Sequence, residues 1–335
     1  MKMKRLLLFL TLPSFAMADA VADAKAAWKA RDYANALKLL DAPDTAGQPD
    51  AIYLKGLMAE TGRGASQSHQ EAAKLYKQAM EKGSNEGTAA WGRYLITATG
   101  GVEKDVEHGL FLIRKAAEAG STSAMTLLGD FALSGTAQEA DPPTAAFWYQ
   151  RASAEKDPLG YLGLAKLYDA GVAGLVKDES RSTVLVLEAA KLGEPLAMNE
   201  MGVRYQSGKG VAQDNVAAIG WFSMAAQHEL AAAQVNLGNC YETGNGCVPD
   251  LNKAGQYYAA AAKQGHPVGQ YMIASLFERG AGAEKPNPVF AYVNYFRAAA
   301  GGYKDAEAKR DALRGSLTKD QMSEAEKILT SGAAK

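Results

Sequence analysis

The chain has 335 residues, of which 47% are hydrophobic and 22% charged, and its 36 Lys and Arg nearly balance its 37 Asp and Glu. This composition excludes a chain disordered by low hydrophobicity, a coiled coil built from charge and a polybasic nucleic-acid binder. The length would suggest two ordinary domains, at roughly 100 to 200 residues each, unless the chain is built from repeats.

The first 18 residues have the pattern of a secretory signal peptide. Lys2, Lys4 and Arg5 precede the apolar run 6–12, and Ala16-Met17-Ala18 is a small-x-small cleavage sequence. A short N-terminal anchor is the alternative, although a spanning helix needs about 20 apolar residues. Cleavage between Ala18 and Asp19 would remove three basic residues and leave 33 against 37 acidic ones. We therefore expect a soluble, mildly acidic periplasmic protein with no nucleic-acid partner and no membrane insertion after cleavage.

A repeat follows the signal peptide and dominates the chain. Each copy contains two small residues five positions apart, and a large apolar residue directly precedes the second of them. The second small residue, which we number position 0, falls at Gly56, Gly92, Gly129, Ala165, Gly202, Gly238 and Ala274. The spacings are 36, 37, 36, 37, 36 and 36 residues. So constant a period predicts seven copies of one structural unit over residues 50–303.

Each unit is predicted to be an antiparallel pair of helices. Apolar and small residues recur at helical spacing and break at glycines, as in Gly208-Lys-Gly210, Gly244-Asn-Gly246 and Gly280-Ala-Gly282. A polar residue then precedes the second helix, and Asp214, Asp250 and Asn287 are the expected N-caps. Glycine inside a helix costs about 1 kcal/mol relative to alanine, so position 0 marks a close approach of a neighbouring helix. We expect aromatic residues nineteen positions later, as at Phe111 and Trp221, to fill the gap between hairpins.

At these residues the sequence resembles the Sel1-like repeats, which are relatives of the tetratricopeptide repeats. The segment 197–226 matches best, with Ala197-x4-Gly202, Tyr205, Gly208-x-Gly210-Val211, Asp214, Ala218-x2-Trp221 and Ala225-Ala226. The units around Gly92, Gly129 and Ala165 depart from the pattern. The resemblance implies an all-α fold, a right-handed α-solenoid of about seven stacked helix-turn-helix repeats.

Both ends of the array are expected to be closed by capping helices. Residues 19–49, which contain Arg31-Asp32-Tyr33-Ala34-Asn35-Ala36-Leu37, resemble a degenerate tetratricopeptide-type hairpin. Residues 304–335 follow the last repeat and should form helices over 304–314 and 319–329. The capping box Thr318-Lys-Asp-Gln321 opens the last of them.

The residues that usually carry chemistry give no catalytic or metal site. The four histidines, His69, His108, His228 and His266, lie in different units with no metal-ligand spacing. No cofactor and no metal are therefore expected. The two cysteines, Cys240 and Cys247, either form a disulfide that pins the loop of the sixth unit or remain unpaired.

The remaining candidate site is a surface stripe of the first helices. Positions −3, +1 and +4 lie opposite the packed positions on a helical wheel, and in stacked hairpins they would line the inner, concave face. Their apolar, aromatic and charged residues suit a protein partner, although a solvated face with nothing bound is the alternative. The candidate partner contacts on and beside this first-helix stripe are Tyr53, Arg93, Tyr94, Asp130, Lys166, Asp169, Asn199, Arg204, Asn239, Glu242, Tyr271 and Glu278.

We therefore predict a non-enzymatic protein that binds another protein. The resemblance adds two kinds of partner, because exported Sel1-like proteins include immunity proteins that neutralise secreted antibacterial effectors, such as a lipase or phospholipase, and envelope scaffolds. Assembly of cell-wall material, exopolysaccharide or the division machinery is thus the alternative function. A hydrolase of β-lactams or cell-wall material is less favoured, because we expect no Ser-x2-Lys signature of that chemistry in the sequence.

Overall fold

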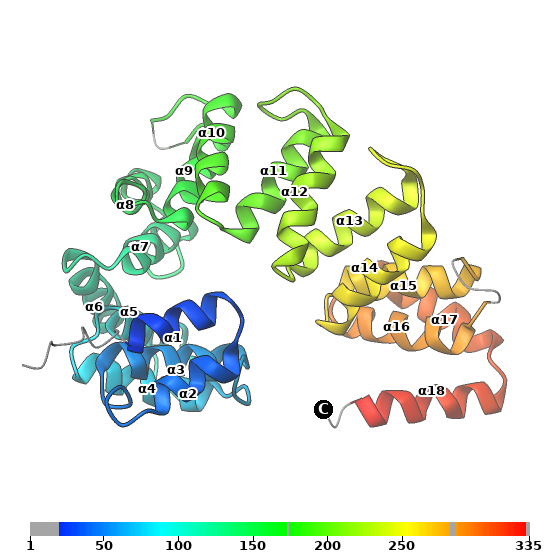
Figure 1. Ribbon diagram of the computed structural model, residues 1–335, viewed down its shortest axis with the longest axis horizontal. Coiled ribbons are helices and arrows are strands. Elements are labelled where there is room, and N and C mark those ends of the chain that lie inside the picture. The colour runs from blue at the N-terminus through cyan, green and yellow to red at the C-terminus, as the bar shows by residue number, and fades with distance from the viewer. Residues whose placement is uncertain (1–19, 173, 282–285, 333–335) are drawn as a thin grey trace, which may run out of the picture. The chain divides into compact units, whose positions relative to one another are not determined.

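The computed structural model describes residues 20–172, 174–281 and 286–332, and in these ranges every regular element is helical (Figure 1). Residues 1–148 and 149–335 form two compact units. The first unit contains α1 (Ala20–Lys29), α2 (Tyr33–Asp41), α3 (Pro49–Thr61), α4 (His69–Glu81), α5 (Asn85–Thr97), a 3₁₀ turn (Thr99–Gly101), α6 (Val106–Glu118), α7 (Thr122–Ser134) and the start of α8 (Pro142–Ala154).

The second unit continues from α8 with helices of nearly constant length. These are α9 (Pro158–Ala170), α10 (Glu179–Lys191), α11 (Pro195–Ser207), α12 (Asn215–Gln227), α13 (Ala231–Thr243), α14 (Leu251–Lys263), α15 (Pro267–Arg279), α16 (Pro288–Ala300), α17 (Lys304–Ser316) and α18 (Lys319–Gly332). Within a unit, the second helix of one pair lies against the first helix of the next, as α10 does against α11. The fold is an all-α solenoid of stacked hairpins.

The helix ends follow the predicted turn chemistry. Gly208 and Gly244 end α11 and α13 with φ of +77° and +76°, a left-handed conformation that glycine adopts without strain. The predicted N-caps are confirmed: Asp214, Asp250 and Asn287 each accept a hydrogen bond from a backbone N–H in the first turn of the helix that follows.

The small residue at position 0 accommodates an aromatic ring of its own hairpin. A Cβ atom on Gly202 would lie 2.5 Å from the ring of Phe222, and one on Gly238 would lie 2.6 Å from the ring of Tyr258. The close approach is therefore confirmed, and the ring that makes it lies twenty residues on. Trp221, nineteen residues on, packs as expected between hairpins, against the cluster that includes Val186 and Met201. The expectation for Phe111 is wrong, because its side chain is 61% exposed.

The terminal helices lie close to the predicted ranges. α1 and α2 pair with each other and pack onto α3 through a cluster that includes Leu40, Leu54 and Met58. The capping box of α18 is confirmed, since Thr318 N donates to Gln321 Oε1 at 2.9 Å and Gln321 N donates to Thr318 Oγ1 at 3.3 Å. The predicted signal peptide, with Ala18 and Asp19, lies outside the described residues. Among the helices described, none combines the length and hydropathy needed to cross a membrane.

Candidate functional site

A cleft of about 290 Å³ lies between α9 and α11 in the second unit. Its apolar lining comprises Leu162, Ala165, Val186 and Leu196. Its polar lining comprises Lys166, Asp169, Asn199, Glu200 and Arg204. Such a mixture of apolar surface and a few convergent polar groups is typical of binding sites.

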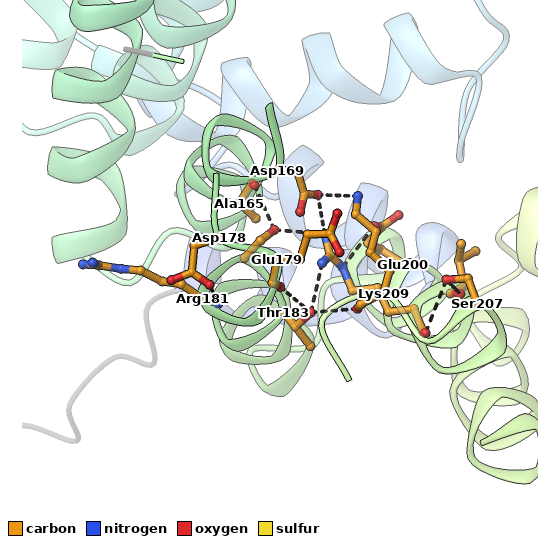
Figure 2. A network of polar contacts seen from close by, with 12 residues as sticks. Ala165, Asp169, Asp178, Glu179, Arg181, Thr183, Glu200, Ser207 and Lys209 are labelled. Atoms are coloured by element: carbon orange, nitrogen blue, oxygen red, sulfur yellow. Dashed lines mark hydrogen bonds and ion pairs between the residues drawn. The ribbon is translucent and has the colours of Figure 1, made fainter. Parts of the chain in front are cut away.

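The guanidinium of Arg204 is the centre of the polar lining, and the side chain is only 1% exposed. Its Nη2 donates to Asp169 Oδ2 at 2.6 Å and to Ser182 Oγ at 3.0 Å, while Nη1 donates to Thr183 Oγ1 at 2.9 Å (Figure 2). Its Nε lies 3.1 Å from Glu200 Oε1. A buried guanidinium is tolerated here because two carboxylates compensate its charge and its Nη atoms donate to one carboxylate and two hydroxyls, although Nε makes no hydrogen bond within the described chain.

One carboxylate oxygen of Asp169 accepts hydrogen bonds from two cationic side chains, and the other oxygen has no donor in the described chain. Oδ2 accepts from Arg204 and, at 2.7 Å, from Lys209 Nζ, as Figure 2 shows. Oδ1 is buried and has no hydrogen-bond partner in the described chain. The nearby Ser182 hydroxyl donates its proton to Ala165 O at 2.8 Å. Burial raises the pKa of Asp169, but the bonds from Lys209 and Arg204 outweigh it, so the pKa lies below its ordinary value.

Acidic residues at position +4 recur in a simpler arrangement, which we call the carboxylate clasp. The acid accepts a tyrosine hydroxyl from the second helix of its own hairpin and pairs with a cation from the next helix pair. In the first unit, Glu60 accepts from Tyr76 Oη at 2.5 Å and from Arg93 Nη2 at 2.7 Å. The clasps of the second unit are Glu242 with Tyr258 and Arg279, and Glu278 with Tyr295 and Lys309.

The clasp of Glu60 predicts a loss of stability in acid. Burial raises the pKa of Glu60, but the hydrogen bonds from Tyr76 and Arg93 bring it below its ordinary value of 4.5. Because the folded pKa is the lower one, the contribution is complete above pH 4.5 and is lost as pH falls below it. Glu60→Gln should cost about 2 kcal/mol at neutral pH and much less at pH 3, measured by urea unfolding.

The matched control is the exposed pair of Glu71 and Lys74, one turn apart on α4. Glu71→Gln should change the free energy of unfolding by less than about 1 kcal/mol at either pH. A pH-independent effect of Glu60→Gln would contradict the clasp.

Four of the predicted partner contacts come together in the cleft: Lys166, Asp169, Asn199 and Arg204. The structure leaves the others apart from it. In the first unit, Asp130 is exposed and Arg93 belongs to a clasp, next to Tyr53, whose pKa burial raises to about 12. In the second unit, Asn239 is exposed, Tyr271 packs against Tyr295 and Tyr303, and Glu242 and Glu278 belong to clasps.

Two of the predicted partner contacts are wrong as surface residues. Tyr94 is fully buried, with its ring 5.3 Å from that of Tyr76, and Arg204 is buried in its polar network. Both stand at position +2, which faces the second helix of the hairpin; Met58, Leu167 and Leu276 are buried at the same position. Arg204 therefore forms part of the cleft wall, and the residues available for contact with a partner are its neighbours in the cleft.

Two polar residues of this region were missed by the sequence analysis. Glu200 lies one helical turn before Arg204, and this i, i+4 spacing of opposite charges is a sequence signal that indicates a pair. Lys209 lies in the turn after α11 and reaches back to Asp169 of the preceding hairpin. No spacing in the sequence indicates that contact.

The possible disulfide is not formed in the structure, where Cys240 and Cys247 are free thiols. Cys247 Sγ instead donates to Cys240 O at 3.5 Å. Cys240 is 1% exposed, and burial, with a smaller contribution from Cys247, raises its pKa to about 11.

Alkylation with iodoacetamide followed by mass spectrometry tests this state. We expect Cys247 to react in the folded protein and Cys240 to react at least about 100-fold more slowly, because the thiolate is the reactive form. After unfolding without reductant, two adducts should appear. A mass two daltons low that accepts no adduct would instead establish the disulfide.

The expectation of no Ser-x2-Lys signature is wrong as to spacing, which occurs twice, at Ser153 with Lys156 and at Ser316 with Lys319. Ser153 Oγ donates to Gln150 O and Ser316 Oγ donates to Leu313 O, both at 2.9 Å, so neither hydroxyl is directed to its lysine. Within the described ranges, no three His, Cys, Asp or Glu residues converge closely enough to hold a metal ion.

Six segments of the chain match a known repeat model, the Sel1 repeat, and together they span more than half of the residues: 49–84, 89–121, 122–157, 195–229, 231–266 and 267–303. The chain belongs to the Sel1 repeat family. The Sel1 repeat is a protein–protein interaction fold. No curated protein matches the chain.

Solved structures of Sel1 repeat proteins share the fold. The protective antigen c5321 of uropathogenic Escherichia coli, which displays an SLR fold, is 25% identical with a TM-score of 0.55, over 94% of this chain and 68% of that one. A Sel1 repeat protein from Oxalobacter formigenes is 25% identical with a TM-score of 0.53, over 73% of this chain and 97% of that one. The immunity protein Pa5087 from Pseudomonas aeruginosa is 23% identical with a TM-score of 0.47, over 67% of this chain and 83% of that one, a similarity that carries no conclusion about function.

The cleft lies beside the hairpin that departs most from the Sel1 pattern. Residues 158–194, which contain α9 and α10, fall between matched repeats and are not matched themselves. They nevertheless fold into a hairpin whose two helices each have 13 residues, as in the matched repeats. This hairpin therefore has the same fold as the matched repeats but a different sequence. It contributes Lys166, Asp169, Ser182 and Thr183 to the cleft and its polar network.

Proposed function

We propose that this Sel1 repeat protein is a non-enzymatic, periplasmic protein that binds a partner protein through the first-helix stripe, with the cleft between α9 and α11 at the centre of the contact. The observation that carries the proposal is the cleft itself. It joins exposed apolar surface at Leu196, which is 51% exposed, to unpaired polar groups in a hairpin of unusual sequence. Apolar patches surrounded by polar groups are typical of interaction surfaces.

Export is the second part of the proposal. Its support is the basic start, the apolar run 6–12 and the small residues up to Ala18. Expression of the full-length chain in a Gram-negative host, with mass measurement of the periplasmic product, tests it. A product that begins at Asp19 supports export, whereas an uncleaved chain retained in the cytoplasm contradicts it.

Site-specific photocrosslinking tests the binding surface. A photoreactive residue in place of Lys166 should give a discrete crosslinked species in the periplasm of the native host, identified by mass spectrometry. The matched control carries the same group at Lys191, an exposed residue of α10 that lies outside the cleft. Equal crosslinking at both positions, or none at any stripe position, would count against the proposal.

Neutralisation of an antibacterial effector is the more specific form of this function, and the family resemblance supports it. A gene for a toxin, such as a lipase or phospholipase, should then lie beside this one. Deletion of this gene should arrest growth when the effector is present, and unchanged growth would leave only the general binding function.

A further inference from the structure

The cleft between α9 and α11 presents two hydrogen-bond donors that the described chain leaves without an acceptor. Asn199 Oδ1 accepts from Asn236 at 2.9 Å, whereas the Asn199 Nδ2 protons have no acceptor in the described chain. The ammonium of Lys166 is exposed and has no carboxylate within 4.0 Å among the described residues. Asp169 Oδ1 and Arg204 Nε also have no partner in the described chain, but both atoms are fully buried and out of reach of an occupant. The cleft thus offers two donors to an occupant.

The charges around the cleft favour an anionic occupant. Asp169 and Glu200 are already compensated by Arg204, and Lys209 adds a second cation to Asp169. Lys166 is the remaining charge, so the five residues together carry one net positive charge. A carboxylate placed against Lys166 would gain a charge-assisted hydrogen bond, which is about twice as strong as a neutral one.

The size of the cleft favours one residue of an extended chain. Its 290 Å³ lies just below the range for ligand pockets, roughly 300 to 1,000 Å³. Leu162 and Leu196 offer apolar surface to a flanking side chain.

We propose that the cleft binds an acidic residue in an extended segment of the partner protein, with an apolar residue beside it. The carboxylate pairs with Lys166 and accepts from Asn199 Nδ2. The apolar neighbour packs on Leu162 and Leu196. This inference rests on the proposed function and specifies the chemistry of the partner at that site.

Titration of the ¹⁵N-labelled mature chain with capped peptides tests the inference. Acetyl-Leu-Asp-Leu-amide should shift the backbone amide signals of Lys166, Asn199 and their neighbours in a saturable way. Acetyl-Leu-Asn-Leu-amide should bind about tenfold more weakly because it lacks the charge.

Variants of the chain separate a specific site from general attraction of anions. Lys166→Met should remove the preference for the Asp peptide over the Asn peptide. Lys263→Met, which removes an exposed lysine outside the cleft, should keep it. Equal binding of the Asp and Asn peptides would overturn the inference, and so would equally tight binding of free aspartate.

Failure of the peptide and failure of the proposed function give different results. If the Asp peptide leaves the cleft signals unchanged but a photoreactive residue at Asn239 or Arg93 captures a defined partner, the inference fails and the binding function stands. If no stripe position captures a partner, both the inference and the proposed function fail.

Discussion

Replacement of Arg204 by methionine should lower the free energy of unfolding by about 3 kcal/mol. The substitution leaves the carboxylate of Asp169 in a largely buried site, where the side chain is 17% exposed. Removing one partner of a buried pair costs about 3–5 kcal/mol because the other charge is left without compensation. We expect the lower end of this range, since Lys209 still contacts Asp169. Chemical denaturation of the chain measures the effect.

A matched control is the exposed guanidinium of Arg279, which is 51% exposed in its clasp with Glu242. Arg279→Met should cost less than about 1 kcal/mol. Adding Asp169→Leu to Arg204→Met should recover most of the loss, because Met58 and Leu133 stand at the equivalent positions of other hairpins. Equal costs for Arg204→Met and Arg279→Met would contradict the central place of Arg204.

The substitution Gly202→Ala should destabilise the protein by about 1 to 2 kcal/mol, although alanine favours helices. The new methyl group would meet the ring of Phe222, which is fully buried and 2.5 Å from the Cβ position. Overpacking costs about 1–3 kcal/mol, against a gain in helix propensity of about 1 kcal/mol. Thermal and urea unfolding measure the net change.

The helix that follows provides the control within the same hairpin. Gly220 lies on the exposed side of α12, and a Cβ there would meet nothing within 4 Å. Gly220→Ala should therefore stabilise the protein by about 1 kcal/mol. The opposite signs of the two substitutions are the diagnostic result, and a gain at both positions would contradict the tight packing at Gly202. Phe222→Leu should relieve part of the cost of Gly202→Ala.

Sequence periodicity predicted the fold because it reflects packing that every hairpin repeats. The constant register of position 0, the glycines after the first helices and the caps at Asp214 and Asp250 are local features, and each was found where expected. The ring that faces position 0 is a second aromatic residue, Phe222, which directly follows the predicted Trp221. The sequence alone could not place the facing ring.

The candidate site was predicted only in part, because it depends on contacts between hairpins. Lys166, Asp169 and Asn199 were selected correctly as neighbours of one surface, and the structure brings them to one cleft. Arg204 was misplaced because its charge indicated solvent, whereas its position +2 is apolar or aromatic in the other hairpins. A charged residue at a packed position is a signal for a buried network, and Ser182, in place of the usual Ala or Gly, is its counterpart.

The carboxylate clasps give the array a direction. In each one, the acid belongs to one hairpin and the cation comes from the helix that follows it, so every clasp needs a C-terminal neighbour for completion. In the clasp of Glu278, the cation is Lys309 from α17. Helix α17 thus supplies the contact that the first helix of a further repeat would supply. A chain shortened from its C-terminus to end after the hairpin of Glu60, Glu242 or Glu278 would leave that carboxylate without its cation. The closing helices therefore complete the last carboxylate clasp and also cover the end of the hydrophobic core.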